Sequence, residues 1–367
     1  GRKTWVYTYQ YERRTRWLTL GRYPEMTVAE AHASYGDAVS MLERGLDPGA
    51  KAVQERQVTR TAPNLTELAE LYLEKWAKPR KKSWREDERV LRRDVLPTLG
   101  HKKARAVTRR DINALLDATV ARGAEIQANR TLALVRKMFN FALSRDLVDT
   151  NPCNGVSAPA AERRRDRVLS EDEIGAVLAN LRKARMSGLN RLAVKLQLLT
   201  AQRCGEVLNA EWSEFDLEQG WWTIPAEKAK NKLTHRVPLS AQALAVLAQA
   251  KRLSPDTSFV FASPRGDRAM TPTALALAVR RNLETFEVER FTPHDLRRTA
   301  ASQMTSMGIS RLVVSKLLNH AESGVTAVYD RHSYDQEKRA ALVAWGEKVG
   351  DLMGEASPVI DITRALA

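Results

Sequence analysis

The sequence predicts a mainly α-helical protein with small β elements, an α+β fold built from several domains. Three observations predict this class. The chain has 367 residues, more than one hydrophobic core usually organises. Amphipathic helical periodicity dominates from residue 64 onward, and strand-like alternation is confined to the start of the chain and to residues 221–239. We therefore expect an N-terminal ββα unit, a helical domain and a mixed domain, in that order.

The first predicted domain covers residues 1–55. Aromatic residues alternate with polar or β-branched ones along residues 4–11, and a second strand-like run at 17–21 follows a charged turn, which is typical of a β-hairpin. Thr27 and Glu30 have the spacing of a capping box at the start of a helix. The aromatic, basic strands could form a half-buried core or a surface that contacts DNA. Because the chain starts without a methionine directly before the first strand, we expect this domain to be truncated.

The second predicted domain, residues 60–157, is all helical. Its amphipathic runs cover residues 65–76, 84–95, 110–121 and 128–143. Basic residues gather near helix ends and loops, where phosphates could be reached, although such residues often form only a solvated helix face. The residues expected to bind DNA are Lys81, Lys82, Arg85, Arg92, Lys102, Lys103 and Arg109. A basic linker is expected at residues 158–167.

The third predicted domain, residues 168–335, mixes helices with one β-region. Two strand-like runs, 221–225 and 235–239, enclose a lysine-rich piece, as expected for a hairpin with its tip. Residues 336–367 follow as a C-terminal helix and tail, and the helix has an apolar stripe that needs a covering partner.

The charge balance favours a polyanionic partner. Lys and Arg number 59 against 44 Asp and Glu, which gives a formal charge of +15, and nucleic acid is a common partner of such a basic chain. Cys153 and Cys204 lie far apart without CxxC spacing, which argues against a disulfide framework or a cysteine-rich zinc site. No run approaches the roughly 18 apolar residues that span a bilayer, and no signal sequence opens the chain. We therefore expect a soluble protein of a reducing cytoplasm.

Four short clusters in the third domain contain the residues that suggest chemistry. They are Arg203 with Glu206, the hairpin lysines Lys228, Lys230 and Lys232, His294 with Arg297, and His320 with Tyr329. Each alone has an ordinary structural explanation, such as a surface ion pair or a core tyrosine. Together they supply what phosphoryl transfer through a covalent enzyme intermediate requires: two guanidiniums for the non-bridging oxygens, a tyrosine nucleophile, and Lys230 and His294 as candidate acid and base.

The order of these clusters resembles the catalytic signature of the tyrosine recombinase family, and its P4-type phage integrase branch in particular. Residues 200–206 resemble Thr-Gly-x-Arg-x-x-Glu, and the later clusters are similar to the family's hairpin lysine, His-x-x-Arg and Leu-Gly-His followed by a tyrosine. The resemblance implies catalytic roles for Arg203, Lys230, His294, Arg297, His320 and Tyr329, with Glu206 in support, and neither a metal nor another cofactor. Ala201 and Asn319 depart from the pattern by replacing its glycines, which affects backbone geometry rather than reacting groups.

The tyrosine and the lysine each have neighbours that could take the same role. The third domain contains two tyrosines, and Tyr329, unlike Tyr334, lies nine residues after His320, as in the family pattern. Lys230 resembles the family's hairpin lysine in its distance from the return strand, with Lys228 and Lys232 as alternatives.

The resemblance implies a site-specific DNA recombinase, an integrase that cleaves and rejoins strands through a 3′-phosphotyrosyl intermediate to integrate or excise a mobile element. The implied partners are double-stranded DNA with attachment sites, a homo-tetramer in the synapse, and accessory DNA-bending or directionality proteins, all at the nucleoid in a bacterial cytoplasm. The first two domains resemble arm-type and core-binding DNA-binding domains, and the C-terminal helix is expected to dock on a neighbouring protomer. The alternatives are a type IB topoisomerase-like nicking and relaxing enzyme and a non-catalytic DNA-binding regulator.

Overall fold

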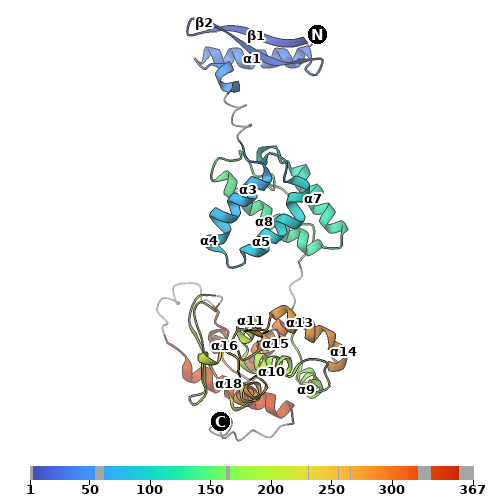
Figure 1. Cartoon of the computed structure of the whole chain (residues 1–367), viewed down its shortest axis with the longest axis vertical. Coiled ribbons are helices and arrows are strands. Elements are labelled where there is room, and N and C mark those ends of the chain that lie inside the picture. The colour runs from blue at the N-terminus through green and yellow to red at the C-terminus, as the bar shows by residue number, and fades with distance from the viewer. Residues whose placement is uncertain are drawn as a thin grey trace. The chain divides into compact units, whose positions relative to one another are not determined.

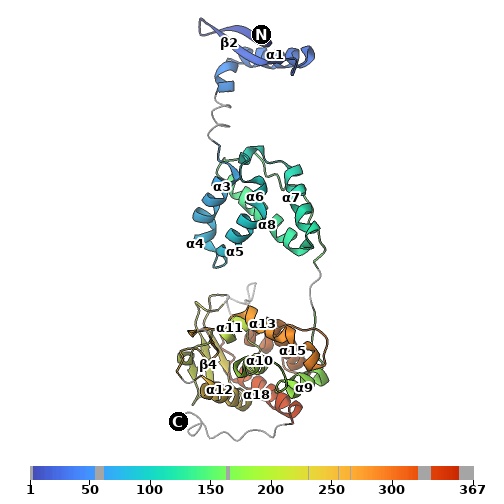
Figure 2. The same cartoon turned by 45° about the vertical axis from the view of Figure 1, so that its right-hand side comes forward.

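In the computed structural model, the described residues are 3–53, 62–162, 166–229, 231–254, 256–264, 266–320 and 332–354. The chain divides into two compact units, Gly1–Arg163 and Arg164–Ala367, which we describe separately. Helices predominate in both units, and strands accompany them (Figure 1, Figure 2). The predicted mainly α fold with small β elements is therefore confirmed, whereas the predicted domain boundaries stay a prediction.

The chain begins with a ββα unit. Strands β1 (Lys3–Tyr11) and β2 (Arg14–Tyr23) pair in antiparallel register. Glu12 and Arg13 between them both have positive φ, as a two-residue hairpin turn requires. Helix α1 (Val28–Glu43) follows and begins at the predicted capping box, which has both of its hydrogen bonds.

The aromatic residues of this hairpin divide between core and surface. Tyr9 is buried, its hydroxyl donates to Asp47, and the backbone N–H of Gly49 donates to that hydroxyl over 2.9 Å. Trp17 on the other strand is 72% exposed. The strands thus contribute both to a core and to a surface, and neither of the two expected uses accounts for all of the aromatic positions.

The helical domain contains the predicted amphipathic helices. They are α3 (Leu65–Tyr72), α4 (Lys78–Arg80), α5 (Trp84–Val90), α6 (Leu96–Leu99), α7 (Arg109–Ala121) and α8 (Glu125–Leu143), with a 3₁₀ turn at Ala104–Ala106. Two π-helical turns, Leu73–Ala77 and Leu91–Val95, join α3 to α4 and α5 to α6. Tyr72, Ile112 and Phe139 are buried in one apolar core formed by these helices.

The second unit packs helices around a small sheet. Its elements are α9 (Glu171–Asn180), α10 (Gly188–Thr200), α11 (Cys204–Leu208), β3 (Phe215–Asp216), β4 (Trp221–Ile224), β5 (His235–Pro238), α12 (Ala241–Leu253), β6 (Ala262–Ser263), β7 (Gly266–Ala269), α13 (Pro272–Arg281), α14 (Leu283–Phe286), α15 (Pro293–Ser306), α16 (Arg311–Leu317) and α18 (Asp335–Leu352), with a 3₁₀ turn at Trp212–Glu214.

The predicted hairpin in this unit is β4 and β5, which pair antiparallel with Trp222 opposite Val237, both fully buried. Strand β3 adds a third strand beside β4, and β6 pairs with β7 in a separate sheet. These three strands were not predicted. Strands β3 and β6 have two residues each, too few for a period-two pattern, and β7 (Gly-Asp-Arg-Ala) has no alternation of apolar and polar residues. Among the helices that the structure describes, none is both long and apolar enough to cross a bilayer.

Helix α18 packs against its own unit. Leu342, Trp345 and Val349 on its apolar stripe are buried, and the indole N–H of Trp345 donates to the carbonyl of Leu198 on α10 over 2.8 Å. The expectation that this helix docks on a neighbouring protomer is therefore wrong for the described part of the C-terminal region. Its stripe is already covered within the chain, where the helix packs against α9, α10, α12, α16 and β5.

Candidate active site

Arg203 lies at the start of α11, directly after the turn that ends α10. The turn reverses at Ala201, which has φ 56° and ψ 19°, a left-handed conformation that glycine adopts more easily and that explains the glycine of the family pattern. The guanidinium of Arg203 donates to Glu206 Oε1 over 2.8 Å, and its backbone N–H donates to Oε2 over 3.1 Å. Glu206 therefore holds both the side chain and the backbone of Arg203.

Arg297 lies on the first turns of α15 and connects two of the predicted clusters. Its side chain is buried, and its guanidinium donates to the carbonyl oxygens of Ala201, over 2.9 Å, and of Leu318. Burial and the nearby positive charge of Arg203 lower the pKa of Arg297 to about 10. At neutral pH the site therefore holds two guanidinium charges within electrostatic reach of each other, a strong attraction for a phosphate group.

The two predicted histidines lie in the same positive field. His294, one turn before Arg297, has its pKa lowered by partial desolvation and by the charges of Arg298 and Arg297. His320 follows α16, and partial desolvation with the charges of Arg297 and Arg203 lowers its pKa. Both imidazoles are therefore favoured in the neutral form at pH 7, and each has a ring nitrogen that can accept a proton.

The turn that ends α16 is held by polar side chains that sequence reasoning missed. The carbonyl of Leu317 accepts hydrogen bonds from Gln202 Nε2 and from His235 Nε2, each at 3.0 Å. Gln202 precedes Arg203 and His235 begins β5, and both side chains are buried. The last carbonyls of a helix have no partner within the helix, so the turn requires donors from elsewhere in the chain. The sequence signal for this contact was His235, which shares the buried face of the strand with Val237.

His235 makes the stability of this unit depend on pH. Desolvation, with a smaller contribution from Lys338, lowers the pKa of His235 from 6.5 to about 4. The unfolded chain therefore binds more protons than the folded chain between these pH values, and stability is fully present above pH 6.5 and falls as the pH decreases through this window. We expect a loss of about 2 kcal/mol between pH 7.5 and pH 5, measured by urea unfolding.

The control for this prediction is His235→Gln, whose amide can still donate to the Leu317 carbonyl but does not titrate. Its unfolding free energy should change less than that of the wild type across the same pH range. Equal pH dependence in the two proteins would contradict the assignment to His235.

The hairpin lysines differ in what they contact. The Lys228 ammonium donates to Glu211 Oε1 over 2.7 Å, to Glu214 and to the carbonyl of Asn209 over 3.0 Å. These carboxylates occupy Lys228 in a structural cluster, which weakens it as an alternative acid. Lys230 lies outside the described residues, so its predicted place is not tested.

The predicted nucleophile, Tyr329, also lies outside the described residues. Tyr334, the alternative, is at the start of α18 with φ 53°. Its ring lies under the ammonium of Lys316, 4.9 Å from the ring centroid, and edge-on to His332 at 4.7 Å between centroids. The choice between the two tyrosines therefore still depends on the spacing from His320.

The predicted DNA-binding residues of the helical domain fall into two groups. Lys81 binds both carboxylate oxygens of Asp87, at 2.6 and 2.7 Å, Lys102 binds Asp111 over 2.5 Å, and Lys103 donates to the carbonyl of Ala62 over 2.6 Å. These three have structural roles that the sequence did not reveal. Exposed side chains are found at Lys82, Arg85, Arg92 and Arg109. These four exposed residues are the better candidates for contacts with DNA phosphates.

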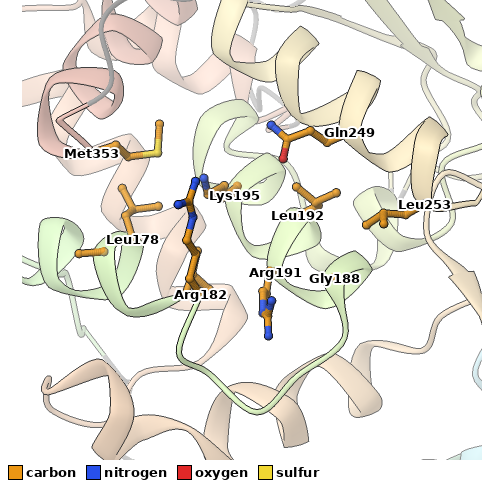
Figure 3. Close-up of a pocket in the computed structure, with 11 residues that line it drawn as sticks. Leu178, Arg182, Gly188, Arg191, Leu192, Lys195, Gln249, Leu253 and Met353 are labelled. Carbon is orange, nitrogen blue, oxygen red and sulfur yellow. The ribbon is translucent and has the colours of Figure 1, made fainter. Parts of the chain in front are cut away.

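A cavity of about 520 Å³ lies in the second unit. Figure 3 shows its lining from α9, α10, α12 and the end of α18, with Arg182, Arg191 and Lys195 beside Leu192 and Met353. It lies toward the start of α10, whereas Arg203 follows the end of that helix. Its lining includes no predicted site residue.

Comparison with known proteins agrees with this fold. Residues 167–336 match the model of the phage integrase family, residues 65–158 that of the phage integrase central domain, and residues 1–56 that of an arm DNA-binding domain. The integrase of enterobacteria phage P4 is 28% identical, with 94% of this chain and 83% of the relative covered. The prophage integrase IntZ of Escherichia coli strain K12 is 27% identical over 98% of this chain and 90% of the relative.

Among solved structures, a lambda integrase tetramer bound to a Holliday junction is similar in fold, with a TM-score of 0.62, 20% identity, and coverage of 88% of this chain and 94% of that one. These matches show that the chain belongs to the phage integrase family. Within it, the chain is a site-specific tyrosine recombinase of the P4-type branch.

Proposed function

We propose that this recombinase cleaves one DNA strand with Tyr329 and rejoins it to a partner duplex. The tyrosine oxygen attacks the backbone phosphorus, the bond from phosphorus to the 5′ oxygen breaks, and the strand is left as a 3′-phosphotyrosyl ester. The 5′-hydroxyl of a second strand then attacks this ester and releases the tyrosine. Neither step consumes a cofactor, because the energy of the phosphodiester is kept in the intermediate.

One observation supports this proposal most strongly: Arg203, Arg297, His294 and His320 come from three separate clusters and share one positive site. The guanidiniums of Arg203 and Arg297 would bind the non-bridging oxygens, where negative charge develops in the transition state. A neutral histidine can accept the proton of the tyrosine, for which His294 is the candidate, and Lys230 would donate a proton to the leaving 5′ oxygen. Glu206 keeps Arg203 in place.

The proposal extends to the partners. The structural neighbour that is a lambda integrase tetramer on a Holliday junction supports a homo-tetramer paired on two double-stranded attachment sites. Residues 1–55 would bind arm-type sites, and residues 60–157 would bind the core site. In the second of these domains, the side chains that would contact DNA phosphates are Lys82, Arg85, Arg92 and Arg109. The protein would act at the nucleoid of a bacterial cytoplasm, integrating or excising a mobile element with accessory DNA-bending or directionality proteins.

A suicide substrate tests the proposal directly. In a duplex nicked close to the cleavage point, the cleaved fragment diffuses away and the covalent complex accumulates. Trypsin would separate the two candidate tyrosines, because cleavage after Lys316, Arg331 and Lys338 gives one peptide of residues 317–331 with Tyr329 and another of residues 332–338 with Tyr334. We expect the nucleotide adduct on the first peptide.

An adduct on residues 332–338 would assign the reaction to Tyr334 instead. The competing classes are separated by a second assay on the same protein. A relaxing enzyme would form the adduct but would not exchange strands between two matched sites, and a DNA-binding regulator would form no adduct at all.

A further inference from the structure

The side-chain amides of Asn231 and Asn319 face each other across 88 positions of sequence. Asn231 Nδ2 donates to Asn319 Oδ1 over 2.7 Å and to its backbone carbonyl over 3.2 Å, and Asn319 Nδ2 donates to Asn231 Oδ1 over 3.2 Å. Both residues are half-buried. A reciprocal amide pair of this kind has one orientation in which all of its donors and acceptors match, and it therefore fixes the relative position of the two backbones.

The backbone at Asn319 explains why this chain can form such a pair. Asn319 has φ 48°, in the left-handed region, where the family pattern has a glycine. Asparagine is among the residues that adopt this conformation most readily after glycine. The substitution therefore keeps the backbone path of the turn while adding an amide that glycine lacks.

The pair joins two segments that carry predicted catalytic residues. Asn231 directly follows Lys230 in the sequence, and Asn319 directly precedes His320. On the hairpin side, the contact from His235 to the Leu317 carbonyl is a second attachment to the same turn. On the other side, Gln202 and Arg297 hold the carbonyls of Leu317 and Leu318. The hairpin tip is thus attached to a turn that is itself anchored beside the arginines.

We propose that the Asn231–Asn319 pair is a positioning device that holds the hairpin lysine, Lys230, in reach of the scissile phosphate. This inference rests on the proposed function, in which Lys230 protonates the leaving 5′ oxygen. Neither asparagine touches the reacting atoms in this account. Without the pair, the hairpin tip would keep its His235 attachment at β5 but lose the contact next to the lysine, and proton donation would slow while DNA binding would not.

A substrate with sulfur in place of the bridging 5′ oxygen distinguishes a misplaced lysine from a general loss of catalytic activity. A thiolate leaves without protonation, because a thiol is a far stronger acid than an alcohol, so cleavage of a 5′-phosphorothiolate substrate does not need the acid. We would compare single-turnover cleavage of the oxygen and sulfur substrates by Asn231→Ala, Asn319→Gly and the double variant. Asn319→Gly removes the amide but keeps a residue suited to the left-handed turn.

On the oxygen substrate, each single variant should be slower by about tenfold to a hundredfold, since a displacement of about 1 Å is enough for such a loss. The double variant should be no slower than the worse single variant, because both changes remove the same contact. The sulfur substrate should restore all three to within about twofold of the wild type on that substrate. Gln219→Ala, an exposed amide before β4, is the matched control and should be normal on both.

Additive effects, no slowing, or equal slowing on both substrates would overturn the positioning role. Lys230→Ala is the reference variant, and the sulfur substrate should restore its cleavage rate. If it does not, the asparagine pair cannot act through Lys230, and the positioning role is rejected. Tyr329→Phe should be inactive on both substrates, and activity there would reject the proposed nucleophile. The two proposals therefore fail through different variants.

Discussion

Replacing Tyr329 by phenylalanine is expected to abolish the covalent protein–DNA complex and to reduce strand cleavage by about 10⁴-fold or more. Phenylalanine keeps the aromatic ring but lacks the oxygen that forms the ester. DNA affinity should change by less than about twofold, because the hydroxyl is one contact among many phosphate contacts. The measurement is the shifted band on a denaturing gel with the suicide substrate, beside a binding titration on intact DNA.

The matched control is Tyr334→Phe. The ring of Tyr334 contacts Lys316 and His332, and phenylalanine keeps these ring contacts. We therefore expect the covalent complex to form in this variant. A covalent band that persists in Tyr329→Phe and disappears in Tyr334→Phe would reverse the assignment.

Replacing Arg297 by alanine is expected to reduce cleavage by about 10³-fold and to destabilise the second unit by about 3 kcal/mol. The two effects have different causes. The loss of a guanidinium removes charge stabilisation from the transition state, whereas the loss of stability follows from leaving the carbonyls of Ala201 and Leu318 without their donor in a buried place. Single-turnover cleavage measures the first effect and urea unfolding the second.

Arg297→Lys separates the two effects further, because a lysine keeps the charge but does not offer the paired geometry of a guanidinium. We expect it to remain nearly as defective in cleavage as the alanine variant. Arg298→Ala is the stability control: its guanidinium is partly exposed and pairs with Asp295, which the capping box still holds. That change should cost less than about 1 kcal/mol, and a cost as large as that of Arg297→Ala would contradict the role given to the buried carbonyl contacts.

The fold was largely predictable because its main signals are local. The capping box at Thr27 and the strand-like alternation of residues 4–11 predict the first unit, and helical periodicity predicts the longer helices α3, α5, α7 and α8. The partner of α18 was not predictable in this way. An apolar stripe on a helix shows that the helix must pack against other residues, but it does not show whether these residues belong to the same chain. For α18 the burial of Trp345 within the chain gives the answer.

The candidate site was predictable only in its arginines and histidines. Arg203, His294, Arg297 and His320 stand out because their chemistry and order are unusual together. Gln202, His235 and Asn231 do not, because their partners are backbone carbonyls or one distant amide, and a hydrogen bond to a carbonyl requires no particular residue at the other position. Likewise, Lys228 could be separated from the other hairpin lysines only after Glu211 and Glu214 were seen beside it.

The burial of α18 also affects how truncated forms of the protein should be designed. A protein cut before residue 336 would lack Trp345 and Val349, and the faces of α10 and α12 that they cover would be open to water. Such a truncation would aggregate or be degraded, and its failure to recombine DNA would say nothing about subunit exchange. Shortened or tagged versions should keep the chain through Gly354, so that any change in assembly is measured on a unit whose interior is intact.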